Sequence, residues 1–207
     1  MRRSASMTIM GIVLLGLFAC SKRTEEKTAG ETSVPSEVEK AAKVPSEVVP
    51  ERQKISAGAE AIERAEIDEQ QRGITVIYLD SRFRSDGMVD RWEIYAKAIG
   101  PIELRVYRRY YEGNRLTYEL VAKSARVRPV HVGRNLFQLV KSMPVKRGDF
   151  AGFYQPEAGV ICFDTVRGAR TAIAPLDVST RAHQHRFAVF GRIYAIRAHG
   201  AAASPPP

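Results

Sequence analysis

The stretch Arg91-Trp92-Glu93-Ile94-Tyr95-Ala96-Lys97 decides the fold, because apolar and polar side chains alternate along it with a period of two. After Gly100-Pro101 the same alternation returns in Ile102-Glu103-Leu104-Arg105-Val106-Tyr107. A period of two is the pattern of a half-buried β-strand. The two stretches therefore predict two half-buried strands separated by a turn at Gly100-Pro101.

Further strands are expected on both sides of this pair. The remaining runs with strand-like composition are 74–79, 116–122, 135–140, 150–154, 159–164 and 186–196. Turn-forming residues separate them at 85–87, 100–101, 112–115, 147–149 and 156–159. About eight short strands without a long amphipathic helix predict an all-β domain at 55–198, an antiparallel jelly-roll-like sandwich. We expect its interior to contain Trp92, Ile94, Leu104, Val106, Leu120, Phe137, Phe153 and Phe163.

A resemblance supports this fold. The succession of 87–96, 100–108, 136–139 and 145–154 resembles uncharacterised jelly-roll-like β-sandwich modules of extracellular proteins. The shared motifs are turns and strands, such as Gly148-Asp149. The resemblance therefore implies fold and location and brings no chemistry.

The N-terminus reads as a secretory signal peptide at 1–19. Residues 1–8 contain two arginines and no acid, and Ile9 to Phe18 is apolar. This apolar core has about 10 residues, whereas a membrane-spanning helix needs about 20. We expect a cleaved leader and no permanent membrane span.

The leader ends in Leu17-Phe18-Ala19-Cys20, which resembles the lipobox of bacterial lipoproteins. The resemblance implies cleavage before Cys20 and lipid on its thiol, so that the protein is anchored to a membrane through its N-terminal lipid. Several acyl chains anchor a protein firmly, at about 0.8 kcal/mol for each buried methylene. Ser21 resembles the pattern that directs lipoproteins to the outer membrane of cells with two membranes. The alternative is a chance cysteine after an ordinary signal cut.

Residues 20–54 are expected to form a disordered polar linker. They contain no aromatic residue, and the segment 34–38 is repeated at 44–48 with a proline in each copy. As a flexible coil the linker would span on the order of 30 Å. Residues 55–71 have two readings, a helix around Ala59–Glu66 or the first edge strand of the domain. A disordered tail is expected at 199–207.

Charge is unevenly distributed along the chain. Residues 21–71 hold 8 basic and 12 acidic side chains, and residues 72–207 hold 22 basic and 11 acidic ones. Of the 22 basic side chains in 72–207, 18 are Arg. A basic, arginine-rich domain favours an anionic partner, which is an acidic polysaccharide, lipid headgroups or another envelope protein. We expect no specific nucleic-acid partner. The alternative is that the arginines reflect genome composition.

One dense group of residues is a candidate ligand-binding face. Arg105, Tyr107, Arg109 and Tyr111 lie at alternate positions and would share one face of a strand. Arginines interleaved with aromatic rings suit sugars, phosphates and polyanions. The alternative is a solvated face on which arginine stems cover tyrosine rings.

No common catalytic motif occurs in the chain, so we expect no enzyme and no cofactor. His183 and His185 would point to one side of a strand and are the nearest approach to a metal pair. The alternative function is therefore a metal-dependent hydrolase that uses these two histidines. Calcium ligation by Asp149, Glu157 and Asp164 is a weaker hypothesis than their role as ordinary turn acids. Cys162, in an apolar run, is expected to be a buried thiol.

Overall fold

The structure is a computed structural model that describes residues 53–203. The predicted signal peptide, Cys20, the linker up to residue 52 and the last four residues lie outside the described residues. The described part of the chain contains no helix that is long and apolar enough to cross a membrane.

Strands make up nearly all of the regular secondary structure of residues 53–203, with turns and loops between them. One short 3-10 helix, η1 (Gln184–Arg186), is the exception. The strands are β1 (Lys54–Gly58), β2 (Ile74–Arg82), β3 (Gly87–Ala96), β4 (Glu103–Glu112), β5 (Arg115–Lys123), β6 (Gly133–Val145), β7 (Phe150–Gln155), β8 (Phe163–Thr165), β9 (Thr171–Ala174), β10 (Arg181–His183), β11 (Ala188–Phe190), β12 (Arg192–Tyr194) and β13 (Ile196–Ala202).

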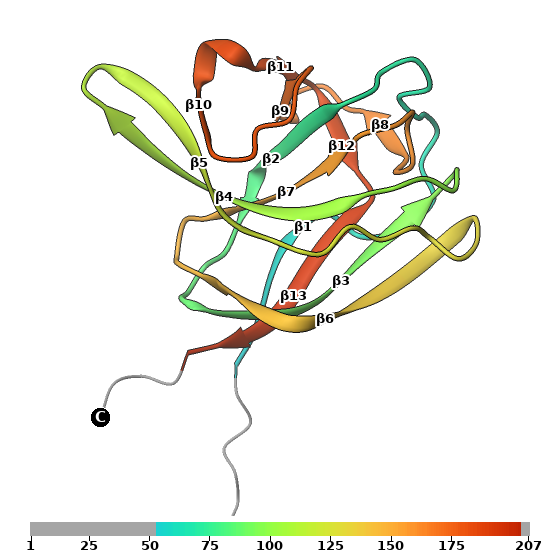
Figure 1. Ribbon diagram of the computed structural model, residues 1–207, viewed down its shortest axis with the longest axis horizontal. Coiled ribbons are helices and arrows are strands. Elements are labelled where there is room, and N and C mark those ends of the chain that lie inside the picture. The colour runs from blue at the N-terminus through green and yellow to red at the C-terminus, as the bar shows by residue number, and fades with distance from the viewer. Residues whose placement is uncertain (1–52, 204–207) are drawn as a thin grey trace, which may run out of the picture. The chain divides into compact units, whose positions relative to one another are not determined.

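The strands form two facing sheets, and within each sheet every pair of neighbouring strands is antiparallel (Figure 1). The larger sheet has the order β10-β5-β4-β7-β2-β9-β11, and the smaller has the order β1-β13-β3-β6. β8 and β12 form a separate ribbon. The chain alternates between the sheets, since β3 and β6 lie in one and β4, β5 and β7 in the other. The all-β antiparallel sandwich predicted from the alternation of side chains is confirmed.

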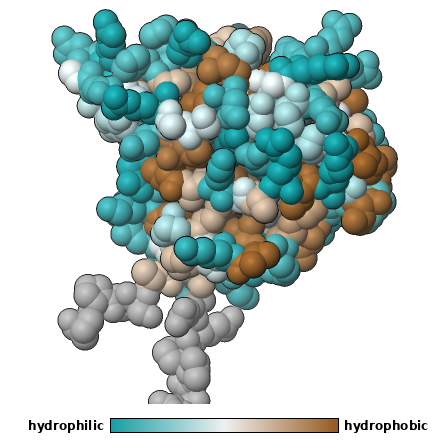
Figure 2. All heavy atoms as spheres, in the orientation of Figure 1, coloured by the Kyte–Doolittle hydropathy of each residue, from teal (hydrophilic) through white to brown (hydrophobic). Residues whose placement is uncertain are grey.

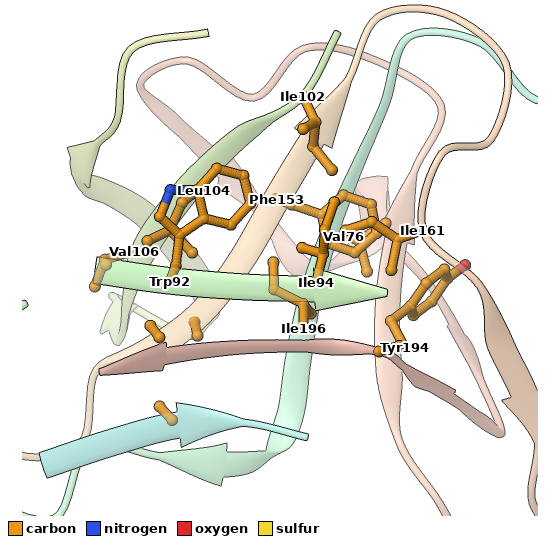
Figure 3. Packing of buried hydrophobic residues seen from close by; sticks show 14 of the residues in the cluster. Val76, Trp92, Ile94, Ile102, Leu104, Val106, Phe153, Ile161, Tyr194 and Ile196 are labelled. Atoms are coloured by element: carbon orange, nitrogen blue, oxygen red, sulfur yellow. The ribbon is translucent and has the colours of Figure 1, made fainter. Parts of the chain in front are cut away.

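The main core lies between the two sheets (Figure 3). Trp92 is fully buried at its centre, with its ring centroid 4.7 Å from that of Phe137. Of the eight predicted interior residues, Leu120 and Phe137 are partly buried and the other six are buried. Each large apolar side chain that leaves water contributes roughly 1.5–3 kcal/mol, so this core accounts for much of the stability.

A second core covers the outer face of the larger sheet. Tyr107 of β4, Tyr118 of β5 and Phe150 of β7 are buried there. The segment from β9 to η1 covers them with Val178 and Phe187, and the Phe187 ring meets Tyr118 edge-on at 5.1 Å between centroids. The face of β4 that points away from the main core is therefore also shielded from water near Tyr107.

The strand reading of the segment after the linker is confirmed for Lys54–Gly58, which pairs with β13. The helix reading of Ala59–Glu66 is wrong. The backbone N–H of Ala65 donates to Asp164 at 2.9 Å, and Glu66 forms an isolated bridge with Phe163. These distant contacts hold the segment extended, although its residues are strong helix formers.

The sheet also extends further at the C-terminal end than expected. β13 continues to Ala202, so the predicted start of a disordered tail at residue 199 is wrong. Residues 199–202 continue the pairing of β13 with β3 past a bulge at His199/Gly200. The backbone N–H of Ala202 donates to the Gln53 carbonyl at 2.8 Å, which places both ends of the described chain side by side.

Polar and apolar side chains gather in different places on the surface. Figure 2 shows hydrophilic side chains over the β4–β5 hairpin and hydrophobic ones at the opposite side of the same face. The exposed apolar residues around the edge strand β6 are Val130, Val132, Leu136 and Val140.

The β4–β5 hairpin turns at Gly113, whose φ of 59° fits the first central position of a type II′ turn.

Candidate anion-binding groove

Three adjoining hollows in the surface meet at Arg82, the last residue of β2. Their volumes are about 740, 400 and 260 Å³, and Arg82 lines all three. We call the three together the arginine groove. Its basic lining residues are Lys54, Arg82, Arg84, Arg109, Arg147, Arg170 and Arg197, and its acidic lining residue is Asp80.

The centre of the groove is shaped by a buried phenylalanine. Phe83 is fully buried, and its backbone N–H donates to the Asp149 carbonyl at 2.9 Å. Because successive side chains of an extended chain point in opposite directions, burial of Phe83 exposes Arg82 and Arg84. The Gly148 N–H donates to the Phe83 carbonyl at 2.9 Å, which brings the β6–β7 turn beside them.

Arg147 of this turn completes the central hollow. Its backbone N–H donates to Asp86 at 2.8 Å, and its side chain is exposed. Within residues 53–203 the guanidinium groups of Arg82, Arg84 and Arg147 form no ion pair or hydrogen bond, so all three remain available to an anion in solvent. A guanidinium presents five N–H donors in a planar fork that matches carboxylate, sulfate and phosphate oxygens.

The end of the groove on the larger sheet combines charge with an aromatic ring. The Arg109 guanidinium lies over the Phe150 ring at 5.4 Å from its centroid. Opposite it, Arg170 donates from Nε to Asp80 at 3.0 Å and from its backbone N–H to the same carboxylate at 2.6 Å. The one acidic group of the groove is thus already neutralised by a neighbour.

The predicted face of alternate arginines and tyrosines is divided by the fold. Arg109 lies in the arginine groove, and Tyr111 is 73% exposed near the tip of the β4–β5 hairpin. Arg105 and Tyr107 are buried under the segment that follows β9. Only half of the predicted face can therefore meet a ligand.

Arg105 is instead the centre of a buried polar network. It donates to Glu103 from Nε at 3.2 Å and from Nη2 at 2.7 Å, and to Asp177 from Nη1 at 2.6 Å. Its guanidinium lies 4.3 Å from the centroid of the Tyr154 ring. Glu103 also accepts two hydrogen bonds from Arg126, at 2.9 and 2.8 Å. These contacts compensate the buried charges and are structural.

The network shifts the pKa values of its members. Burial acts to lower the pKa of Arg105, but hydrogen bonds, above all to Asp177, outweigh it and the pKa is raised. For Glu103, burial acts to raise the pKa, while hydrogen bonds from Arg105 and Arg126 lower it below its usual value. Burial raises the pKa of Tyr107 to about 12, and its hydroxyl donates to the Val178 carbonyl at 3.0 Å. All three residues keep their ordinary charge at neutral pH.

A second buried cluster joins Asp68 to the end of the β-sandwich. The Tyr194 hydroxyl donates to Asp68 at 2.6 Å, and Arg192 donates to the same carboxylate at 2.7 Å. The Arg192 guanidinium also stacks 4.2 Å from the centroid of Phe163. Because Asp68 and Tyr194 are buried, this cluster fixes a loop and does not form a surface site.

The two histidines lie close together, with ring centroids 5.8 Å apart. His183 shares a hydrogen bond of 2.9 Å between Nδ1 and the buried Thr117 hydroxyl. Among residues 53–203, no three His, Cys, Asp or Glu side chains are grouped as metal ligands require. The described part of the chain thus supplies no third ligand for the hydrolase hypothesis. The three acids considered for calcium are also apart, each paired with a different arginine: Asp149 with Arg108, Glu157 with Arg128 and Asp164 with Arg64.

Cys162 is fully buried, as predicted. Burial raises the pKa of its thiol, which lies 3.5 Å from the Tyr95 carbonyl oxygen. It is a packing residue of the main core.

The arginine groove was missed by sequence reasoning. Of its three central residues, Arg82 and Arg84 are close in sequence, but Arg147 follows more than sixty positions later. The sequence did place turns at 85–87 and 147–149, each next to an arginine. An arginine beside each of two turns was the available signal, but nothing local shows that the two turns meet.

Comparison with protein-family models, with curated proteins and with solved structures found no match to this chain. The argument for function therefore rests on the groove and on the N-terminal sequence.

Proposed function

We propose that the chain is an exported lipoprotein, anchored through Cys20, whose β-sandwich is a non-enzymatic module that binds acidic glycans in the cell envelope. In a cell with two membranes the anchor is in the outer one. The proposal that the domain binds acidic glycans rests on the arginine groove. Its three connected hollows are lined by seven basic side chains and by one acidic side chain, Asp80, whose charge is neutralised by Arg170.

The character of the groove favours a glycan over a protein partner. Protein interfaces usually depend on apolar or aromatic anchors near their centre. Here the apolar lining residues Phe83 and Ile55 are buried and belong to the main core, and Leu79 is half-buried, while Arg82 and Arg84 are exposed. Phe150 is buried beneath Arg109, and its ring supports the exposed guanidinium, which can donate to an acidic group of a sugar.

The shape of the groove favours a chain over a bilayer. A membrane surface is broad and meets a protein along a flat or convex face, whereas the arginines here line hollows. An acidic polysaccharide can enter such hollows and place carboxylate or sulfate groups beside the guanidinium forks.

Binding can be tested with the full-length mature chain and an immobilised heparin-type polysaccharide at low and high salt. The triple variant Arg82→Ala, Arg84→Ala, Arg147→Ala is expected to bind about 10- to 100-fold more weakly, since each exposed arginine next to an anionic partner contributes up to about 1 kcal/mol. The matched control is Arg72→Ala, Arg167→Ala, Arg186→Ala, which removes the same charge from exposed positions outside the groove.

The control should lose only a few-fold in affinity. Equal losses in the two triple variants would mean that binding follows net charge and not the groove. Absence of salt-sensitive binding to any acidic glycan would overturn the proposal, and selective capture of a protein partner by the same arginines would replace the glycan.

The anchor is tested separately, in cells. A Cys20→Ser variant should lose lipid labelling and membrane retention, because only this thiol lies at the predicted cleavage site. The control is Cys162→Ala, which removes the buried cysteine and should leave both unchanged. Wild-type protein in the soluble fraction, with an unmodified Cys20, would contradict the lipoprotein assignment.

A further inference from the structure

The three hollows are joined in an order that follows the strands. The hollow of about 260 Å³ lies over β4, β7 and β2 and is lined by Arg109, Phe150 and Arg170. It shares Asp80 and Arg82 with the central hollow. The hollow of about 400 Å³ lies between β1 and β2 and shares Ser81, Arg82 and Arg84 with the central one.

Sheet geometry gives the length of this path. β4 and β2 are separated by β7, because Tyr107 and Arg82 both pair with Phe150, so they lie about 10 Å apart. β1 belongs to the facing sheet but comes close to β2 at this edge, where the Gly58 N–H donates to the Ser81 hydroxyl at 3.0 Å, and Arg197 lies on β13, the strand paired with β1. The path from Arg109 over β7, β2 and β1 to Arg197 thus takes four steps between neighbouring strands and is on the order of 20 Å.

Charge is present along the whole path and is not concentrated at one point. Arg109 and Arg170 lie at one end, Arg82, Arg84 and Arg147 at the centre, and Arg197 at the other end; of these, Arg170 pairs with Asp80 at 3.0 Å and Arg197 with Glu60 at 3.9 Å. A single compact anion could contact only one of these groups at a time. A chain with anionic groups at regular intervals could contact all of them.

From this arrangement we infer that the ligand is a linear polyanion that lies across all three hollows in an extended form, from Arg109 over Arg82 to the hollow between β1 and β2. The inference rests on the proposed function and specifies its ligand: an unbranched acidic glycan with charges on successive units. Each hollow then acts as a subsite, and affinity depends on how many subsites a chain can reach at once.

The test is a length series of size-fractionated heparin oligosaccharides, from the disaccharide to the decasaccharide, titrated into the mature chain by calorimetry. Affinity should rise with length until the oligosaccharide spans about 20 Å and then level off. Inorganic sulfate should compete only weakly with the long oligosaccharides, because it fills one subsite.

Two variants, one at an end of the path and one at its centre, make the test sharper. Arg109→Ala and Arg147→Ala should each weaken binding of the long oligosaccharide about fivefold, and together about 25-fold, as independent subsites require. For the disaccharide at most one of the two variants should matter. Arg167→Ala, outside the groove, is the matched control and should change neither ligand.

Failure of the inference differs from failure of the proposed function. If the disaccharide or inorganic sulfate binds as tightly as the decasaccharide, the groove holds a compact anion and the extended path is refuted, while anion binding stands. If no member of the series binds, both are refuted.

Discussion

Replacing Arg105 with methionine is expected to lower the free energy of unfolding by about 3 kcal/mol. Removing one partner of a buried ion pair usually costs about 3–5 kcal/mol, because the other charge stays buried. Glu103 would stay buried but keep its two hydrogen bonds from Arg126. Asp177 is 43% exposed and can turn to water. The cost therefore falls at the lower end of the range.

The measurement is urea unfolding followed by fluorescence of Trp92, the one tryptophan of the chain and a fully buried residue. With an m-value of about 2 kcal/mol/M, the midpoint should fall by about 1.5 M. Arg109→Met removes an exposed arginine of the same strand and should shift stability by less than about 0.5 kcal/mol. A loss below about 1 kcal/mol for Arg105→Met would refute the structural role assigned to Arg105.

The same comparison has a predicted pH dependence. The pKa of Glu103 is lower in the folded protein than in the unfolded chain, so its contribution to stability is present above the unfolded pKa and is lost as pH falls through the folded pKa. The Arg105→Met variant loses part of that lowering. The stability gap between wild type and variant should therefore be widest near neutral pH and should narrow below about pH 4.

Three further predictions concern the core. Gly152→Ala should destabilise the domain by about 2 kcal/mol or more in the same urea assay, because the new Cβ would lie 2.3 Å from the Val76 carbonyl oxygen; wild-type stability would contradict this close approach. Tyr194→Phe should cost about 1–3 kcal/mol, since the buried Asp68 loses a hydrogen bond of 2.6 Å, and a neutral result by thermal melting would contradict it. Cys162, whose thiol pKa is raised by burial, should resist a maleimide at pH 8 until urea unfolds the protein, and rapid labelling of the native protein would show that it is accessible.

The long strands from β2 to β7 were predictable because their signal is local. The runs 159–164 and 186–196 were each predicted as one strand, but the first holds only the start of β8 and the second is divided into β11, β12 and the start of β13. Leu104 and Val106 alternate with Glu103 and Arg105, and in the structure the two apolar residues belong to the main core. The same alternation was misleading for the second face of β4, where Arg105 was expected to meet solvent. It is buried because a segment more than seventy positions away covers it, which no local pattern reveals.

The groove and the extended segment 59–66 have the same kind of cause. Arg84 and Arg147 line one hollow because the Phe83 backbone is hydrogen-bonded to Gly148 and Asp149 of the β6–β7 turn, and Ala65 is held extended by Asp164. In both cases a long-range contact determines the structure. For 59–66 it overrides a local preference for helix, and for the two arginines no local preference exists. The sequence could show that arginines are abundant, but only the fold shows which of them share a hollow.

The neighbouring ends of the domain also determine how it responds to mechanical force. β1 is an edge strand whose first pair, Lys54 with Ala201, lies at the end where the chain enters and leaves. Pulling the two ends apart would break the backbone hydrogen bonds between β1 and β13 one pair at a time, beginning at Lys54 and Ala201, so β1 should detach at low force. Gln53 and residues of β1 also line one hollow of the arginine groove. The strand expected to detach first under tension is therefore one that shapes the groove.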